Sequence, residues 1–252
     1  MSRLTDFKLL CFDVYGTLID WETGVLNALQ PLLLSAHNAT FTRGKLLTVY
    51  HECEASQQSE TPDMKYQDLL ATILPHVASK LELQAPSDEQ CQQFGATIGQ
   101  WPAFPDSVDA LQRLGKYYKL VVLSNVDVES FRKSLAGPLA GAHFDAIITA
   151  QDVGSYKPDQ RNFEHMLRVV GDKFGVTREQ VLQTAQSQFH DHEPARKQGI
   201  KSSWIYRPGA AMGNTGGEIY DWKFATLGEM ADALEKDLAG SDVWTLVDGL
   251  PE

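Results

Sequence analysis

The sequence contains few cysteines, and none of them form a metal-binding pair. Its 252 residues include three cysteines, Cys11, Cys53 and Cys91, and no C-x-x-C motif. An odd number of widely spaced cysteines offers neither a disulfide framework nor a zinc site, and it suits a reducing compartment. We therefore expect a cytoplasmic protein without structural disulfides.

Long apolar runs and an excess of positive charge are also missing. No stretch approaches the roughly 18 apolar residues that a membrane-spanning helix needs, and the first residues reach Asp6 too early for a signal peptide. Lys and Arg number 22 against 33 Asp and Glu, which gives a net charge of −11. Such a charge argues against a general nucleic-acid binder, although it does not exclude a local basic pocket. We expect neither a membrane nor a nucleic-acid partner.

Five short apolar segments are typical of strands buried inside a sheet. They are residues 7–12, 120–123, 146–149, 181–185 and 203–206. Helical apolar stripes separate the later segments; one runs through Phe163, Met166, Leu167 and Val170. This alternation predicts an α/β fold with a doubly wound, mainly parallel sheet. Such sheets bind their ligands at the carboxyl ends of the strands.

The chain between the first two predicted strands is far longer than one crossover helix requires. Apolar stripes between residues 20 and 100 predict several helices and no strand. We expect residues 19–101 to form a helical cap, inserted into an α/β core made of residues 1–18 and 102–252. The linkers are expected near residues 18–22 and 101–105, where Trp21 and Trp101 are placed to line an entrance.

Asp13 follows the first apolar segment and precedes Gly16 and Thr17. A carboxylate at this point can act as a nucleophile for covalent catalysis. From this segment alone, a structural role as a loop cap is equally compatible.

Polar residues also follow the next three strands. Ser124 and Asn125 end the second strand, Lys157 lies in a loop after the third, and Asp191 lies beyond the fourth. Because the carboxyl ends of parallel strands meet at one edge, these side chains are expected to converge on Asp13. Their convergence favours the interpretation of Asp13 as a nucleophile.

Four motifs occur in a familiar order: FDVYGTL (12–18), LSN (123–125), YKPD (156–159) and SQFHDHEPARKQG (187–199). Together they resemble the haloacid dehalogenase (HAD) superfamily of aspartate-nucleophile hydrolases, many of which carry a cap at the position of the helical insertion. The resemblance covers about residues 7–207. Each motif is weak by itself, whereas four in order are specific.

Tyr15 indicates which branch of the superfamily the sequence resembles. Phosphatases of the superfamily usually show D-x-D, whose second aspartate protonates the leaving oxygen, and tyrosine cannot act as such an acid at neutral pH. D-x-Y-G-T resembles the L-2-haloacid dehalogenases of type II. A halide leaves as a stable anion and needs no proton. The alternative is that Tyr15 simply packs under the cap.

The resemblance implies a role for each matching residue. Asp13 attacks the substrate carbon and forms an ester, Lys157 pairs with Asp13, and Asp191 orients the water that hydrolyses the ester. The remaining matches bind the substrate: Thr17 and Ser124 hold its carboxylate, while Asn125 lies beside the halide. No cofactor is required in this scheme.

The sequence departs from the dehalogenases in the substrate wall. The halide-binding arginine of the early cap helices is replaced by His51 or a neighbour, and the only arginine nearby is Arg43. The tyrosine that often follows the lysine by six residues is Phe163. An uncharged histidine is a weaker host for an anion than a guanidinium group. The catalytic residues therefore match those of the dehalogenases, whereas the residues expected to contact the substrate differ.

His190 and His192 flank Asp191 in an H-x-H pattern. Zinc ligation is one interpretation, but no third ligand is evident from the sequence. We favour His190 as a polar residue of the substrate wall.

The sequence thus predicts hydrolytic dehalogenation of a small (S)-2-haloacid, an anionic molecule, to the 2-hydroxy acid. The first alternative is a Mg²⁺-dependent phosphatase that uses Asp13 and Asp191 as ligands. The second is a binding relic with little turnover. A homodimer is left open.

Overall fold

The computed structural model describes residues 2–34, 40–213 and 218–247 of the chain. Its centre is a six-stranded parallel sheet with the strand order β3-β2-β1-β4-β5-β6. The strands are β1 (Leu9–Phe12), β2 (Lys119–Ser124), β3 (Ala146–Thr149), β4 (Val181–Ala185), β5 (Lys201–Ile205) and β6 (Trp222–Phe224). The order reverses direction around β1, which places this strand in the middle of the sheet.

All five predicted strands lie within two residues of their expected bounds, and β1 begins two residues later than expected. Phe7 precedes the strand and packs edge-on against Trp222, with ring centroids 5.4 Å apart. β6 was not predicted, because a strand of three residues is too short to show a recognisable apolar pattern.

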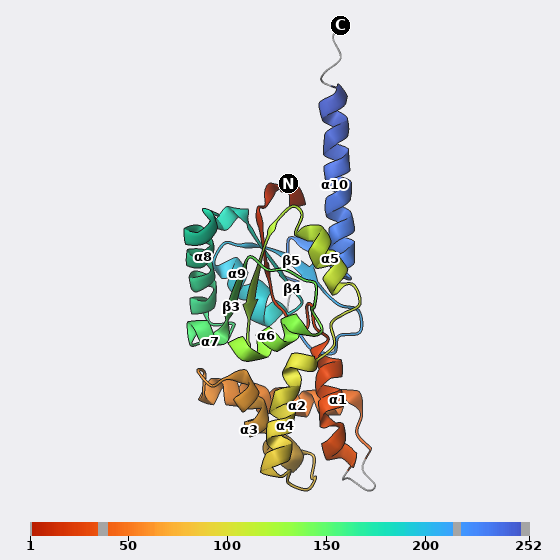
Figure 1. Cartoon of the computed structure of the whole chain (residues 1–252), viewed down its shortest axis with the longest axis vertical. Helices are drawn as coiled ribbons and strands as arrows, with labels where there is room; N and C mark the ends of the chain where they lie inside the picture. The colour runs from red at the N-terminus through yellow and green to blue at the C-terminus, as the bar shows by residue number, and fades with distance from the viewer. Residues whose placement is uncertain (1, 35–39, 214–217, 248–252) are drawn as a thin grey trace.

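Helices cover both faces of the sheet (Figure 1). A short helix, η1 (Leu4–Asp6), precedes β1, and α5 (Ser107–Leu114) directly precedes β2. The helices that follow β2 are α6 (Val128–Ala136), α7 (Ala150–Val153), α8 (Gln160–Phe174), α9 (Glu193–Lys197) and α10 (Leu227–Val247), with the short helices η3 (Arg178–Gln180) and η4 (Gln188–His192). No described helix is long and apolar enough to span a membrane.

Alternate side chains of β1 belong to two separate hydrophobic cores, one on each face of the sheet. Leu9 and Cys11 pack with Phe163 and other residues of α8, whereas Leu10 and Phe12 belong to the core that contains α5 and α10. Successive residues of a strand point to opposite faces, so a continuous apolar run is expected where both faces are covered. The predicted doubly wound α/β class is confirmed.

Between β1 and β2 the described residues form helices and no strand, as the apolar stripes predicted. We refer to these helices as the helical insertion: α1 (Trp21–Leu34), α2 (Arg43–Glu60), α3 (Tyr66–Lys80), α4 (Asp88–Ala96) and η2 (Thr97–Gln100). In Figure 1 they lie together beyond one end of the sheet, while the amino-terminus and α10 lie toward the other end.

The two connections between the helical insertion and the sheet run side by side. The amide of Asp20 donates to the carbonyl of Pro102 (2.8 Å), and the amide of Phe104 donates to the carbonyl of Leu18 (3.0 Å). These contacts lie within the predicted linkers. The paired segments hold the insertion against the carboxyl end of β1, where Asp13 follows the strand.

Candidate active site

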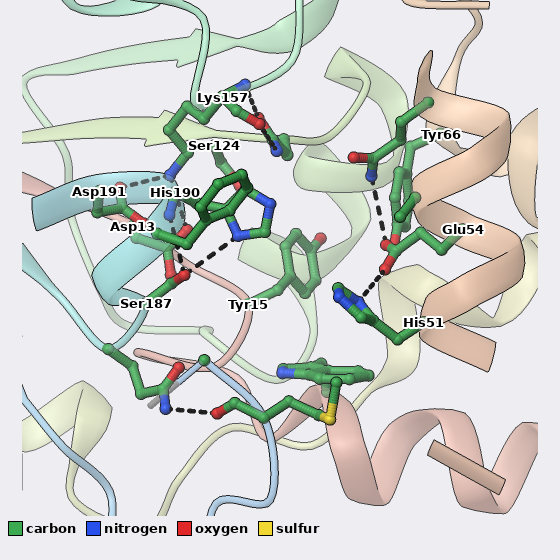
Figure 2. A pocket seen from close by; sticks show the side chains of 18 of the residues that line it. Asp13, Tyr15, His51, Glu54, Tyr66, Ser124, Lys157, Ser187, His190 and Asp191 are labelled. Atoms are coloured by element: carbon green, nitrogen blue, oxygen red, sulfur yellow. Dashed lines mark hydrogen bonds and ion pairs between the residues drawn. The ribbon is translucent and has the colours of Figure 1, made fainter. Parts of the chain in front are cut away.

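A cavity of about 240 Å³ lies between the sheet and the helical insertion (Figure 2). The sheet side and its loops contribute Asp13, Tyr15, Ser124, Asn125, Lys157, Gln186, Ser187, Phe189, His190 and Asp191. The insertion and the segment that follows it contribute Trp21, His51, Glu54, Ala55, Gln58, Tyr66 and Trp101, and the loop after β5 contributes Ala211, Met212 and Gly213. All but one of the predicted site residues therefore line a single cavity; the exception is Thr17.

Asp13 lies at the floor of the cavity with its carboxylate fixed on both oxygens. The hydroxyl of Thr17 donates to Oδ2 (2.7 Å), and the ammonium of Lys157 donates to Oδ1 (2.9 Å). The turn after β1 needs Gly16, whose φ of +101° is unfavourable for residues with a side chain. This tight turn brings Thr17 back to Asp13 and leaves the carboxylate facing the cavity.

Lys157 links the two carboxylates of the site. Its ammonium donates to Asp13, to Asp191 (2.8 Å) and to the carbonyl of Leu123 (2.9 Å), so all three of its N–H bonds are used. Burial lowers the pKa of Lys157, but the two carboxylates raise it by more, and the net shift is upward. Lys157 therefore stays positively charged and holds Asp13 in one orientation.

Asp191 lies in η4 and is fully buried. Its Oδ1 accepts hydrogen bonds from Lys157 and from Gln183 Nε2 (2.9 Å), while its Oδ2 has no hydrogen-bond partner among the described residues. Burial raises the pKa of Asp191. A carboxylate with a raised pKa and a free oxygen is suited to accept a proton from water.

Thr17 differs from its expected role. It was expected to hold the substrate, yet it is fully buried and outside the cavity lining. Its hydroxyl oxygen also accepts a hydrogen bond from the amide of Gln186 (2.9 Å) while it donates to Asp13. Thr17 is therefore a positioning residue for Asp13 and not a substrate ligand.

Asn125 lines the cavity, but its side chain is also committed to Lys157. Its Nδ2 donates to the carbonyl of Lys157 (3.0 Å), and its Oδ1 accepts from the amide of the same residue (2.7 Å). This reciprocal pair fixes the loop that carries Lys157. Ser124 is different, because its buried hydroxyl has no partner among the described residues and lines the cavity. Ser124 is thus free to bind a ligand.

Tyr15 combines the two interpretations that the sequence left open. Its hydroxyl hydrogen-bonds with Ser134 (3.0 Å), and its ring packs edge-on against Trp101 with centroids 5.8 Å apart. Burial raises the pKa of Tyr15, so the phenol stays neutral. The residue packs beneath the helical insertion and also lines the cavity.

The insertion supplies an acidic side chain opposite Asp13 (Figure 2). Glu54 accepts a hydrogen bond from the hydroxyl of Tyr66, and its other oxygen lies 3.6 Å from Nδ1 of His51. Arg43 lies elsewhere: it pairs with Glu22 and lines a second cavity of about 110 Å³. His51 is therefore in the predicted wall, but beside a carboxylate.

The two histidines of the H-x-H pattern point to different surroundings. His190 lines the cavity, and its Nδ1 hydrogen-bonds with Ser187 Oγ (3.1 Å); burial and the charge of Lys157 lower its pKa to about 4. His192 is fully buried and uses both ring nitrogens, with Ser202 (2.8 Å) and the carbonyl of Ala185 (2.9 Å). The pattern is therefore not a zinc-binding pair.

Magnesium fits the acidic residues poorly. Both oxygens of Asp13 and one oxygen of Asp191 accept hydrogen bonds from protein groups, and the second oxygen of Asp191 is buried. Within the described residues, no three His, Cys, Asp or Glu side chains are grouped closely enough to hold a metal ion. Hard divalent cations need several free oxygen ligands.

Sequence reasoning missed three residues that support the site. Gln183 holds Asp191, and Arg207 donates to the carbonyl of Thr17 from Nε (2.9 Å) and Nη2 (2.7 Å). Glu54 forms the acidic wall. Gln183 could have been noticed as a polar residue inside an apolar strand. Nothing in the sequence distinguished Arg207, in a loop, or Glu54, on a helix, from the other charged residues of the chain.

Comparisons with known proteins identify the family of this chain. Residues 7–182 match the family model of haloacid dehalogenase-like hydrolases. The (S)-2-haloacid dehalogenase of Pseudomonas sp. (strain YL) is 28% identical over 229 residues, which cover 90% of this chain and 94% of that protein.

Two solved structures share the fold at lower identity. The L-2-haloacid dehalogenase of Xanthobacter autotrophicus with chloropropionic acid covalently bound superposes with a TM-score of 0.73 at 18% identity, covering 91% of this chain and 98% of that one. A HAD-hydrolase of Bacillus subtilis bound to magnesium gives a TM-score of 0.70 at 15% identity, covering 91% and 99%. These two likenesses concern the fold alone, whereas the family model covers most of the chain, including the first three motifs. The chain belongs to the haloacid dehalogenase-like hydrolases.

Proposed function

We propose that this hydrolase removes the halogen from a small (S)-2-haloacid through a covalent ester on Asp13. The observation that carries the proposal is the environment of the Asp13 carboxylate. It faces the cavity, fixed by Lys157 and Thr17, and the residue two positions later is the neutral phenol of Tyr15 instead of a carboxylic acid. A nucleophile without an adjacent acid suits a leaving group that departs as a stable anion.

In the first step, an oxygen of Asp13 attacks C2 of the substrate. The new carbon–oxygen bond forms as the carbon–halogen bond breaks, and the halide leaves with the bonding electron pair. The unpartnered hydroxyl of Ser124 supports binding of the substrate carboxylate on this side of the cavity. Lys157 keeps Asp13 oriented for an in-line attack.

In the second step, water attacks the carbonyl carbon of the ester. Asp191 accepts one proton of the water, because its raised pKa makes it a stronger base than an exposed aspartate. Lys157 stabilises the negative charge that develops on the ester oxygen. The intermediate then releases the 2-hydroxy acid, which takes the proton of the new Asp13 carboxyl group, and the proton on Asp191 passes to solvent.

The phosphatase alternative predicts a different requirement. It needs a divalent ion between Asp13 and Asp191, where the ammonium of Lys157 already bridges the two carboxylates. Magnesium dependence therefore separates the two functions.

The test is chloride release from (S)-2-chloropropionate, measured beside hydrolysis of p-nitrophenyl phosphate, each with EDTA and with magnesium. We expect chloride release that EDTA leaves unchanged and that Asp13→Asn lowers by at least about 10³-fold, as for loss of other catalytic nucleophiles. Asp172→Asn, an exposed acid on α8, is the matched control and keeps its activity. Phosphate hydrolysis that EDTA abolishes and magnesium restores, without chloride release, would move the assignment to the phosphatases.

A further inference from the structure

The wall of the cavity that faces Asp13 carries an acidic side chain. Glu54 of α2 lines the cavity with a side chain that is only 15% exposed. Its Oε1 accepts the hydroxyl of Tyr66, which in turn hydrogen-bonds with Tyr50 (3.0 Å). Both tyrosines are neutral donors, and burial raises their pKa further. They hold the carboxylate in place without cancelling its charge.

The cations near this wall are already paired. Lys157 is the sole lysine or arginine among the described residues that line the cavity, and it binds Asp13 and Asp191. Arg43 of the same helix as Glu54 is paired with Glu22 outside the cavity. A second anionic group on the substrate would therefore meet a carboxylate at this wall and no free guanidinium group.

His51 does not give this wall of the cavity a net positive charge. Its Nδ1 lies 3.6 Å from a carboxylate oxygen of Glu54, and this neighbouring carboxylate raises the pKa of His51. When His51 is protonated it neutralises Glu54, and when it is neutral the charge of Glu54 is uncompensated. The wall therefore carries no net positive charge in either protonation state of His51.

Aromatic side chains surround the same space. The rings that line the cavity belong to Tyr15, Trp21, Tyr66, Trp101 and Phe189. The faces of aromatic rings attract cations, and several such rings with a carboxylate form the usual binding site for an ammonium group. A simple 2-haloacid with a short alkyl chain has no cation that this carboxylate and these rings could bind.

We propose that the substrate is a 2-haloacid that also carries a quaternary or protonated amine, and that Glu54 is the residue that selects it. This inference rests on the proposed function for the end of the substrate that Asp13 attacks. Figure 2 places Glu54 and Asp13 on opposite sides of the cavity, so one molecule spans both with its ammonium group toward the insertion. Glu54 then pairs with the cation, and the aromatic rings exclude water from the pair.

The first experiment measures binding alone. Choline and its uncharged isostere 3,3-dimethylbutanol are titrated calorimetrically into the full chain at pH 8. We expect choline to bind about tenfold tighter than the isostere, which corresponds to about 1.4 kcal/mol. Glu54→Gln should abolish this preference. Glu52→Gln, on the same helix but paired with Lys80 outside the cavity, should preserve it. Equal binding of the two molecules by the wild-type protein contradicts the inference.

The second experiment separates this inference from the proposed function. Chloride release is compared for 2-chloro-4-(trimethylammonio)butanoate and 2-chloro-5,5-dimethylhexanoate, an isostere that keeps the carboxylate and lacks the ammonium charge. We expect kcat/KM to favour the ammonium compound by about tenfold or more in the wild type, and the two values to converge in Glu54→Gln. Equal turnover of both compounds overturns the role of Glu54 and leaves the dehalogenase intact. Preferential choline binding without chloride release from either compound overturns the dehalogenase and leaves the cation site.

Discussion

Lys157 is the side chain on which the chemistry of the site depends most, because its ammonium joins two carboxylates from different strand ends. All of its N–H donors are used, so it moves little when the charge on Asp13 changes during ester formation. Removing one partner from a buried ion pair leaves an uncompensated charge that typically costs about 3–5 kcal/mol. Substitution of Lys157 therefore affects folding and catalysis together.

Asp191→Asn tests the second chemical step more cleanly. Loss of this carboxylate leaves Asp13 and Lys157 as a neutral pair, so folding is retained. Without a base to activate water, the ester on Asp13 accumulates. We expect one equivalent of chloride in a burst, followed by turnover at least about 10²-fold slower than in the wild type.

Mass spectrometry of this variant after reaction should show an adduct with the mass of the substrate minus hydrogen chloride, on the peptide that contains Asp13. Asp172→Asn serves again as the control and should show neither burst nor adduct. Unchanged steady turnover by Asp191→Asn would remove Asp191 from the mechanism.

For individual residues, the sequence predicted which polar side chains lie near the site. It did not predict what each of them contacts. Asp13, Ser124, Lys157 and Asp191 were predicted because they follow apolar strands that end at one edge of a sheet. The orientation of Thr17 and Asn125 depends on neighbours that tertiary packing supplies. Glu54 was missed because an apolar stripe indicates which face of α2 is buried and not what lies opposite its polar residues.

At the level of elements, the contact between α1 and Trp101 holds the helical insertion at the edge of the sheet. Gly24 of α1 lies so close to Trp101 that an added Cβ would stand 2.3 Å from the indole Cγ. Such a distance requires the ring or the helix to move. Because Trp101 also packs on Tyr15, the movement would reach the cavity.

Gly24→Ala should therefore destabilise the protein by about 1–3 kcal/mol, the usual cost of overpacking, and should lower kcat/KM. Gly44→Ala is the matched substitution in α2, where nothing lies within 4 Å of the added Cβ. It should leave stability unchanged or raise it by up to about 1 kcal/mol. Urea unfolding with chloride release measures both effects. Equal stability of the two variants would show that α1 does not depend on this contact.

The elements themselves were largely predictable, because each long element repeats a local pattern. The helices of the insertion followed from apolar stripes, and five of the six strands followed from short apolar runs. The start of β1 and the existence of β6 did not follow. Both depend on edge contacts: Phe7 packs on Trp222, and β6 pairs with β5 through three residues.

The whole molecule should lose stability in acid through a buried histidine. Burial lowers the pKa of His192 to about 4, compared with about 6.5 in an unfolded chain. Between these values the unfolded state binds more protons than the folded state, so the free energy of unfolding decreases as the pH falls. This stability is fully present above pH about 6.5, and its loss amounts to up to about 3 kcal/mol by pH about 4.

Urea unfolding from pH 7.5 to 4.5 measures this dependence. In His192→Gln the slope over the window should be smaller than in the wild type, whereas His76→Gln, an exposed position on α3, should keep it. Identical slopes in all three proteins would mean that His192 is not the buried group that takes up the proton.

The central claim is that Asp13 forms an ester that water attacks at the aspartyl carbonyl. The most direct measurement is a single turnover, with enzyme in excess over (S)-2-chloropropionate, in water enriched in the heavy oxygen isotope. Mass spectrometry then locates the label. The account predicts that the peptide containing Asp13 gains one heavy oxygen and that the 2-hydroxy acid contains none. A labelled product with an unlabelled Asp13 peptide would show that water attacks the substrate directly, which contradicts the account.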